Sequence, residues 1–541
     1  MLCSVSLCGV AQAQLGVTPP DQFRVPDGFE VELVYEVPSK QQGSWVSLAT
    51  APDGTLVACD QDGSLYEIDV TETPATVTPM DVGIGSAQGI LFAFDSLYVN
   101  VNSRNAKQNG VHRLTDSNGD GSYDRSEHIL PLSGGGEHGP HALILSQDGK
   151  RILTCAGNMT QLPKDIARSR VPQVWQEDHL LTRMPDARGH ASNRMAPGGW
   201  IGSFAPDGSD FELIAVGFRN EYDIALNREG ELFSYDADME WDVGTPWYRP
   251  TRVNHVISGA EFGWRNGTGK WPEYQPDSFG AAVNIGPGSP TGICFGYGTK
   301  YPKKYQEALF IADWSYGNIH AVSLEPNGST YGGTYETFAT AAPLPVTDMV
   351  VRPQDGALYF AIGGRKTQSG LYRIVYRGQL DETESAQPRD MVAVQRRQQL
   401  EQFHRPGVGA DGLQLAIESL DSADRGVRFA ARTVLEHQPF DAWSGWINKI
   451  KSDRARALAV IAMARTTSAD QQSAAFDLLQ RCDWDEMDSE ARIAVLRAYS
   501  LVAIRLGEFA PSQRSSILAQ LDGSFPSGND NLDRELAQVL V

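Results

Sequence analysis

Two histidines stand close together in a glycine-rich stretch, LSGGGEHGPHALILSQDG at 132–149. His138 and His141 are separated by Gly-Pro, follow Glu137, and precede an apolar run that is typical of a β-strand. An imidazole exchanges its proton near neutral pH, so such a pair can serve as a general acid or base. A polar surface loop is the alternative interpretation of a single histidine there. Two histidines beside a carboxylate favour a reactive site.

A second polar group lies in VGFRNEYDIALNREGELFSYDADMEWD, residues 216–242. Arg219 and Asn220 come directly before a predicted strand, and Asp236 and Asp238 follow the hairpin that this strand begins. A guanidinium binds planar acidic groups through two parallel hydrogen bonds, so the Arg-Asn pair is a candidate for holding a planar, acidic ligand. An arginine in a structural ion pair is the alternative.

The stretch DSNGDGSYDRSE at 116–127 satisfies the calcium-loop pattern D-x-N-x-D-G-x5-E. Its predicted ligands are the side-chain oxygens of Asp116, Asn118, Asp120, Asp124 and Glu127 and the carbonyl of Ser122, with Gly121 at the sharp turn. The flanking sequences VHRL and HILPL are typical of strands rather than of EF-hand helices. We therefore predict a Ca²⁺ clip on a hairpin, with a metal-free acidic turn as the alternative.

The elements that must position these residues are short β-rich runs between about residues 25 and 377. One unit recurs six times: an apolar strand, a turn such as Pro-Asp-Gly, and a second strand that ends in aromatic or small residues. The copies are 47–60, 89–102, 142–157, 223–238, 292–314 and 348–364. Radial repetition of such hairpins predicts a six-bladed β-propeller. Long insertions at about 158–215 and 239–285 are expected to build a site on one face.

Beyond residue 377 the composition changes from β-rich to helical. Glycine and β-branched residues become fewer, while Ala, Leu, Arg and Gln recur with helical periodicity. We predict a linker over 378–409 and a HEAT-like α-solenoid over 410–541, where the segment 421–437 resembles the second helix of such a repeat. The last helix, NLDRELAQVLV, has no polar cap, so we expect the natural chain to continue.

Charge and the first residues limit the environment of the protein. The formal net charge of −21 argues against nucleic acid or an anionic membrane surface as a partner. No apolar run reaches the roughly 18 residues of a membrane span. Residues 1–13 resemble the end of a signal peptide, with a small-x-small cleavage pattern at 11–13. We therefore predict export to the periplasm or the extracellular space.

Cysteine usage excludes two kinds of centre. Cys3 and Cys8 lie in the signal-like segment, and the other four cysteines are far apart in apolar contexts. No CxxC or CxxCH occurs, so the given chain carries no c-type haem site and no zinc ribbon. Buried free thiols are the favoured interpretation, with a Cys59–Cys155 disulfide as the alternative.

Several motifs, taken in order, resemble the soluble quinoprotein sugar dehydrogenases of the glucose/sorbosone dehydrogenase type. They are Gln88-Gly89, Glu137-His138, Arg219-Asn220, the loop 236–238 and AEFGWRNGTGKWP, and they cover most of 25–377. The motifs GEHGPH, APGGWI, GFRNEYD, DMEWDVGTPWYRPTRVNH and GGRKTQSGLYR more closely resemble the planctomycete-type "membrane-bound dehydrogenase" or haem-binding group. The resemblance implies a six-bladed propeller with pyrroloquinoline quinone (PQQ) and Ca²⁺ on one face, followed by HEAT repeats and a cytochrome c segment.

The resemblance also implies roles for individual residues. His138 matches the catalytic base, which takes the proton of a sugar C1 hydroxyl while hydride passes to the quinone. Gln88 and Glu137 match positions beside that base. Arg219 and Asn220 match the pair that contacts the quinone.

Two further roles follow from the resemblance at the cofactor. The backbone around Asp238 and Met239 is expected to face the cofactor calcium. The sugar dehydrogenases place an arginine before the last inner strand, where this chain has PLPVTDMVV at 343–351. Arg365 or Lys366 from the next loop is the candidate replacement.

These observations predict an exported oxidoreductase of quinoprotein type that oxidises a sugar or a sugar-derived alcohol and passes electrons to a cytochrome c-type acceptor. The alternative is a non-catalytic glycan-binding propeller with a solenoid scaffold. A propeller lactonase or esterase would need a central calcium cage of carboxylates and Asn, for which no clear ligand set is seen. Counting back from the Asp148-Gly149 turn, we expect His138 to point into the pocket and His141 to bond backbone or line the pocket wall.

Overall fold

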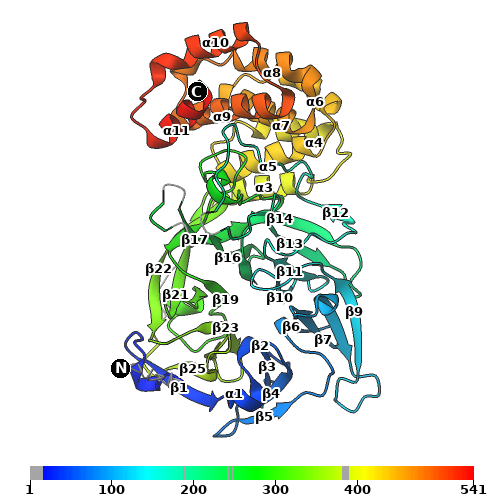
Figure 1. Cartoon of the computed structure of the whole chain (residues 1–541), viewed down its shortest axis with the longest axis vertical. Helices are drawn as coiled ribbons and strands as arrows, with labels where there is room; N and C mark the ends of the chain where they lie inside the picture. Colours follow the sequence, from blue (N-terminus) through cyan, green and yellow to red (C-terminus); the bar gives the residue numbers. More distant parts are fainter. Residues whose placement is uncertain (1–15, 187–188, 240–242, 246–247, 381–388) are drawn as a thin grey trace, which may run out of the picture.

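The computed structural model describes residues 16–186, 189–239, 243–245, 248–380 and 389–541. The predicted signal segment 1–13, with Cys3 and Cys8, lies outside these residues. Among the described residues, six β-sheets occupy 29–376, and the helical part begins at residue 391 (Figure 1). The predicted six-bladed propeller followed by an α-helical solenoid is thereby confirmed.

In blades 1 to 5 of the propeller, the four main strands follow one another from the axis outwards. Blade 1 consists of β2 (Trp45–Thr50), β3 (Leu56–Asp60), β4 (Leu65–Asp69) and β5 (Thr76–Pro79). Blade 2 consists of β6 (Ala87–Ala93), β7 (Ser96–Val101), β8 (Gly110–Thr115) and β9 (Arg125–Pro131). Blade 3 consists of β10 (Pro140–Leu145), β11 (Ile152–Ala156), β13 (Gly199–Phe204) and β14 (Glu212–Phe218), with the short β12 (Arg168–Ser169) parallel to β14.

The remaining blades complete the ring. Blade 4 consists of β15 (Glu221–Leu226), β16 (Leu232–Met239), β17 (Arg249–Val256) and β18 (Val283–Gly286). Blade 5 consists of β19 (Pro290–Phe295), β20 (Leu309–Asp313), β21 (Asn318–Asn327) and β22 (Thr330–Thr340). Blade 6 consists of β23 (Val346–Arg352), β24 (Ala357–Ile362) and β25 (Gly370–Tyr376), with β1 (Phe29–Glu36) as its outermost strand. Because β1 pairs antiparallel with β25, the first described strand closes the ring.

Each of the six predicted hairpin copies forms the two innermost strands of one blade. The outer strands of blades 3 and 4, however, lie largely inside the segments that the sequence marked as insertions. Strand β13 and the first part of β14 fall within about 158–215, and β17 and nearly all of β18 fall within about 239–285. Among the described residues, the longer segments between these strands are 170–186, 189–198 and 257–282. Long connections separate these outer strands from their partners, which hides the blade pattern in the sequence.

The core of the propeller lies between the blades. Blades 1 and 6, for example, share one apolar cluster in which Trp45 and Leu56 pack with Tyr359 and Leu371. A blade has two apolar faces and can bury them only against its two neighbours, so six hairpins with buried strands favour a closed ring. Cys59, Cys155 and Cys294 lie on such strands and, like Cys482, are free thiols.

The same irregularity recurs in all six innermost strands of the described propeller. Each strand of the central ring carries a β-bulge near its start, at Val46, Gln88, His141–Ala142, Tyr222, Thr291–Gly292 and Thr347. A bulge places two residues opposite one and redirects the side chain of the extra residue. The six bulges therefore turn a ring of side chains towards one end of the propeller.

The helical region consists of two layers. The layer next to blades 3 and 4 contains α3 (Met391–Glu401), α5 (Arg425–Glu436), α7 (Asp453–Thr466), α9 (Ser489–Leu501) and α11 (Asp530–Leu540), each in contact with the next (Figure 1). The outer layer contains α4 (Ala410–Ser419), α6 (Phe440–Ile447), α8 (Gln472–Leu479) and α10 (Pro511–Leu521). Two short helices, α1 (Ser39–Gln42) and α2 (Lys303–Gln306), belong to the propeller.

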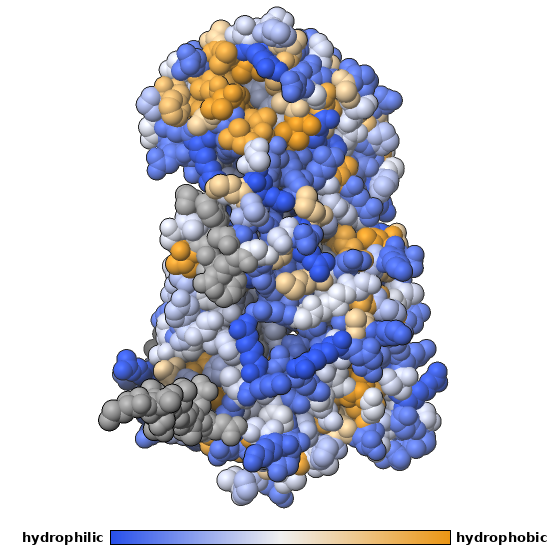
Figure 2. All heavy atoms as spheres, in the orientation of Figure 1, coloured by the Kyte–Doolittle hydropathy of each residue, from blue (hydrophilic) through white to orange (hydrophobic). Residues whose placement is uncertain are grey.

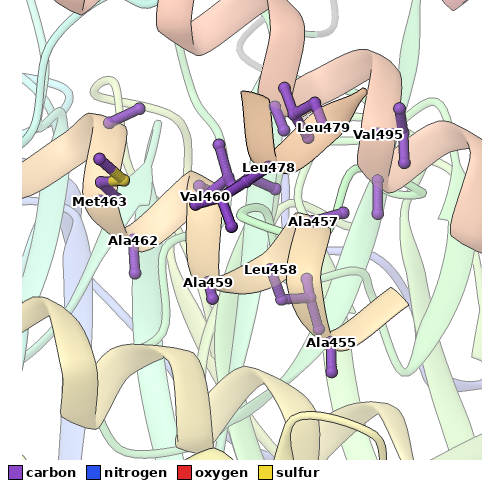
Figure 3. Close-up of a cluster of buried hydrophobic side chains, with 14 of the residues drawn as sticks. Ala455, Ala457, Leu458, Ala459, Val460, Ala462, Met463, Leu478, Leu479 and Val495 are labelled. Atoms are coloured by element: carbon purple, nitrogen blue, oxygen red, sulfur yellow. The ribbon is translucent and has the colours of Figure 1, made fainter. Parts of the chain in front are cut away.

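Small residues let these helices pack closely. In α7, Ala457, Ala459 and Val460 are fully buried, and Figure 3 shows them in a cluster with side chains of the neighbouring helices. Side-chain oxygens cap the inner helices, for example Asp424 at the start of α5, which accepts a hydrogen bond from the Val427 N–H. Helix α3 lies within the predicted linker 378–409, which is therefore not wholly a linker. The assignment to HEAT-type repeats stays a prediction.

The surface differs between the two parts. On the face shown in Figure 2, hydrophilic residues dominate the propeller, whereas hydrophobic residues gather on the helical region. Within the described residues, no helix combines the length and the apolar character needed to cross a bilayer.

Candidate active site

A cavity of about 440 Å³ opens at one end of the central ring of strands. All six bulges contribute to its wall, through Val46, Gln88, His141, Tyr222, Thr291 and Thr347. Loops of neighbouring blades add Glu137, Asn220, Trp314, Arg104, Arg365 and Lys366. The cavity is thus built from every blade, and its position is set by the repeated bulge.

Tyr222 joins three blades beneath this cavity. Its hydroxyl donates to Gln88 Oε1 at 2.8 Å and lies 3.2 Å from the Val46 carbonyl oxygen. Burial raises the pKa of Tyr222 well above its ordinary value, so the phenol stays neutral. Gln88, which the sequence predicted beside the base, therefore lies in the cavity wall with its amide oxygen engaged by Tyr222.

His141 is the histidine that lines the cavity. Its Nε2 lies 3.1 Å from Asn220 Oδ1, and its ring lies over Tyr222 with 4.4 Å between ring centroids. Burial lowers the pKa of His141 to about 4, although the Asn220 contact acts in the opposite direction. The imidazole is therefore neutral at pH 7. Because the Asn220 amide oxygen can only accept, Nε2 carries the hydrogen, and the lone pair that can accept a proton is on Nδ1, which is buried and has no hydrogen-bond partner among the described residues.

His138 is buried and does not line the cavity. Its Nδ1 lies 2.6 Å from Asn158 Oδ1, and its ring centroid is 4.9 Å from that of His190. Burial, with Arg219 as the next cause, holds the pKa of His138 well below its usual range. The expectation that His138 points into the pocket is therefore wrong in this structure, whereas His141 lines the wall as expected. The bulge at 141–142 redirects His141, and this irregularity is invisible when residues are counted back from the turn.

Asn220 faces the cavity, but Arg219 does not. The Arg219 side chain is only 2% exposed. The backbone N–H groups of both residues donate to Asp236 Oδ1, at 3.2 Å and 2.9 Å, and Asp236 is paired with Arg252 at 3.2 Å. The turn formed by Arg219 and Asn220 is thus fixed by the buried carboxylate of Asp236. It presents the Asn220 amide to the cavity, and not the Arg219 guanidinium.

Asp238 also lies outside the cavity wall. It is fully buried and pairs with Arg249 at 3.2 Å and with Arg252 at 4.0 Å. Burial acts to raise the pKa of Asp238, but the two arginines outweigh it and lower the pKa. Met239 ends β16, and its backbone pairs with Arg249 of β17. In this structure Asp238 therefore forms buried ion pairs with arginines of the neighbouring strand β17.

Arg365 reaches the cavity from blade 6 and forms an ion pair with Glu137 of blade 3. Its guanidinium carbon lies 5.0 Å from the centre of the Trp314 ring. Arg365 and Lys366 both adopt left-handed backbone conformations, with φ of 48° and 64°, which non-glycine residues rarely do. The positive charge missing before β23 is therefore present in the cavity, from the loop after β24.

Two buried aspartates lie on inner strands next to the bulges. Asp223 follows Tyr222 and accepts hydrogen bonds from the Ile224 and Ile293 N–H groups, both at 2.8 Å. Asp348 follows Thr347 and accepts from the Leu48 N–H at 2.7 Å. Burial raises the pKa of Asp223 to about 7 and that of Asp348 well above its usual range, where the Asp223 charge adds to the effect. Each carboxylate ties its blade to the next.

Several of these residues were missed by reasoning from motifs, among them Tyr222, Trp314 and Asn158. A signal for the bulge residues does exist, because each stands immediately before one of the six hairpin copies. Alignment of the copies on their first residue places His141, and not His138, in the same column as Gln88 and Tyr222. No comparable signal marks Trp314 or Asn158.

The predicted calcium loop is closed by its own hydrogen bonds. Asp116 accepts from the N–H groups of Gly119 and Gly121 at 2.7 Å and 2.8 Å, and Asp124 accepts from Ser117. Gly121 has a φ of 90°, as the sharp turn requires. In the part of the chain that the structure describes, no group of three or more His, Cys, Asp or Glu side chains is arranged to hold a metal ion. The Ca²⁺ clip at 116–127 stays a prediction.

Comparison with known proteins gives similarity at the level of fold. No protein-family model matches the chain, and no curated protein sequence matches it. Solved structures similar to it include a PQQ-bound aldose sugar dehydrogenase from Streptomyces coelicolor, with 14% identity, a TM-score of 0.43, and coverage of 65% of this chain and 99% of that one.

Two further structures are similar to a comparable degree. The PQQ domain of a pyranose dehydrogenase from Coprinopsis cinerea has 11% identity and a TM-score of 0.45, and the match covers 65% of this chain and 97% of that one. The calcium structure of a carbohydrate-active enzyme of family AA12 from Trichoderma reesei has 15% identity and a TM-score of 0.44, with coverage of 68% and 99%. At these values the activity of the present chain has to be derived from its own residues.

Proposed function

We propose that the chain is a sugar oxidoreductase of quinoprotein type, with its active site in the cavity at the centre of the propeller. The observation that carries the proposal is the combination of Arg365 above the Trp314 ring with a neutral, buried His141 on the wall of the same cavity. PQQ is a planar quinone that carries carboxylates. An indole face and a guanidinium are suitable partners for such a molecule.

The cavity wall offers cations and an aromatic surface that suit PQQ, and two of its cations are paired with carboxylates of the same wall, Arg104 with Asp62 and Arg365 with Glu137. Arg365, Lys366 and Arg104 are cations in the wall, and the Trp314 ring offers a flat apolar surface. Arg219 and Asp238, which the resemblance placed at the cofactor and its calcium, are engaged in internal contacts instead. A bound carboxylate would compete with Glu137 for Arg365, since the two share an exposed ion pair.

The residues of the chain have separate tasks in this proposal. When bound, PQQ supplies the two-electron acceptor for a hydride from the substrate. His141 takes the proton of the substrate hydroxyl, and Asn220 holds the imidazole by its contact with Nε2. Tyr222 fixes the floor by bonding Gln88. His138, the base that the resemblance implies, lies behind this wall and is the alternative proton acceptor.

The experiment is reconstitution of the purified protein with PQQ, with and without Ca²⁺, followed by absorbance and by aldose-dependent reduction of a redox dye. We expect a bound quinone spectrum and turnover, both diminished in Arg365→Ala. Lys303→Ala, which removes a cation far from this cavity, is the matched control. Absence of both quinone binding and turnover would refute the proposal. Glycan binding in calorimetry without turnover would instead support the non-catalytic alternative.

Three attributes accompany this proposal. We infer export, a cytochrome c-type electron acceptor, and Ca²⁺ at 116–127. The first two rest on the signal-like start and on the resemblance, and the third on the oxygen-rich loop pattern. Cell fractionation tests export, and reduction of added cytochrome c by the reconstituted enzyme tests the acceptor. Calorimetric titration with Ca²⁺ tests the loop.

A further inference from the structure

A row of arginines attaches the helical region to the propeller. In the described residues, these are Arg397 of α3, Arg425 of α5, Arg465 of α7, Arg497 of α9 and Arg505 of the π-helical turn Val502–Leu506. They come from successive elements of the inner layer. Four of them donate hydrogen bonds to carboxylates or carbonyls of the propeller, and Arg465 forms ion pairs with Asp178, Glu261 and Asp277 at 3.5 to 3.8 Å. Charged contacts are therefore repeated along the inner layer from α3 to the turn after α9.

The segment 257–282, which joins β17 to β18, receives several of these contacts. Arg497 binds Asp277 through two hydrogen bonds, from Nε at 2.9 Å and from its terminal nitrogen at 2.8 Å. Arg425 donates to the carbonyls of Gln275 and Ser278. Asp277 is fully buried, which acts to raise the pKa of its carboxyl group. The charge of Arg497 outweighs this effect and holds the pKa of Asp277 below its ordinary value.

Part of this segment runs parallel to the last strand of blade 3 and forms an isolated bridge between Glu261 and Val216. Its residues 260–264 run beside the end of β14: the Val216 N–H donates to the Ala260 carbonyl at 3.0 Å, and the Phe262 N–H donates to the Val216 carbonyl at 3.0 Å. The Trp264 N–H donates to the Gly217 carbonyl at 2.9 Å. Residue 218 is the last of β14, and the chain then turns at Arg219-Asn220 into the cavity.

A second path reaches the same corner through side chains. Arg252 donates to the Phe262 carbonyl at 3.2 Å and to Asp236 at 3.2 Å. Asp236 in turn accepts the Asn220 N–H at 2.9 Å. The Asn220 amide then contacts His141. All of these side chains except that of Asn220 are nearly fully buried.

We propose that the helical region positions residues of the active site. Arg497 is a positioning residue that holds the segment 257–282 against β14. The position of β14 in turn fixes Asn220 and His141 in the cavity wall. The inference does not depend on the quinone chemistry, because it concerns the geometry of the cavity wall. The helical region then has a role in positioning the cavity wall, in addition to being a scaffold.

The test compares Arg497→Gln with Arg514→Gln in the full chain. Arg514 lies on α10 and forms an exposed pair with Glu508, so its loss removes the same charge from the helical region without touching the propeller. Hydrogen–deuterium exchange is measured in peptides that cover 213–226 and, as an internal reference, 96–115 in blade 2. We expect the amides of 216–220 to exchange at least about tenfold faster in Arg497→Gln only.

A double variant and the kinetics of two Arg497 variants provide further tests. If Arg497→Gln does not fold, the double variant Asp277→Asn/Arg497→Gln removes both buried charges together, and the same faster exchange is expected at 216–220. If turnover is found, Arg497→Gln should lower kcat more than it raises KM, and Arg497→Lys should recover part of kcat. Faster exchange confined to 257–282 and 489–506, with 216–220 unchanged, would overturn the proposal.

Discussion

The buried carboxylate of Asp223 makes a quantitative prediction about stability and pH. Its pKa is raised by burial from 3.8 to about 7 in the folded protein, while the unfolded chain keeps the ordinary value. The folded state therefore binds the proton more tightly. The stabilisation is fully present below pH 4 and is lost as the pH rises through 7. Each tenfold difference in proton affinity is worth about 1.36 kcal/mol, so the total is about 4 kcal/mol.

The substitution Asp223→Asn removes this titration and keeps the size of the side chain. Asparagine has a single acceptor oxygen for the N–H groups of Ile224 and Ile293, so the loss of one hydrogen bond costs about 1 kcal/mol at every pH. Between pH 5 and pH 8, the free energy of unfolding of the variant should therefore rise by about 3 kcal/mol relative to that of the parent. It should be about 1 kcal/mol less stable than the parent well below pH 4, about equally stable near pH 4.5, and about 3 kcal/mol more stable at pH 8.

The assay is urea unfolding at pH 5, 6, 7 and 8, followed by tryptophan fluorescence, for the parent, Asp223→Asn and Asp81→Asn. Asp81 lies on the surface, so its substitution controls for the change in net charge. A difference between parent and Asp223→Asn that is constant from pH 5 to pH 8 would refute the reasoning. So would a difference that changes in the opposite direction.

Other predictions concern the cavity and the calcium loop. If the cavity is the active site, His141→Ala should lower kcat by about 10²–10⁴-fold, measured by dye-linked turnover with PQQ, and His138→Ala should lower the melting temperature more than His141→Ala does. The reverse order in kcat would restore His138 as the base. Gly157→Ala should destabilise by about 1–3 kcal/mol in urea unfolding, because the new Cβ would lie 2.8 Å from both His138 Cβ and Asn220 Oδ1. Chelator should lower the melting temperature if Ca²⁺ binds at 116–127, and Asp120→Ala should abolish that difference.

The sequence by itself determined the architecture of the propeller. Its six hairpin copies are local patterns, in which alternation of apolar residues and a turn specify two neighbouring strands. Strands with two apolar faces can be buried only between like neighbours, so repetition leads to a closed ring. The change to helical periodicity likewise marked the second part, although α3 was hidden in the supposed linker because a short polar helix has weak periodicity.

The identity of the cavity residues was only partly determined by sequence. Gln88, Glu137 and Asn220 were predicted near the site and line it. The choice between His138 and His141 was decided by a bulge, which depends on pairing between β10 and β11 and leaves no mark in a single strand. Only comparison of all six copies contains that information.

The contacts between distant segments were decided by the tertiary structure alone. Arg365 and Glu137 are 228 residues apart, and Arg497 and Asp277 are 220 residues apart. Closure of the ring brings blade 6 opposite blade 3, and docking of the helices brings α9 onto the segment after β17. Hydrophobic periodicity specifies which face of an element is buried, but it does not specify which partner covers that face. Ion pairs across such interfaces therefore become visible only once the chain is folded.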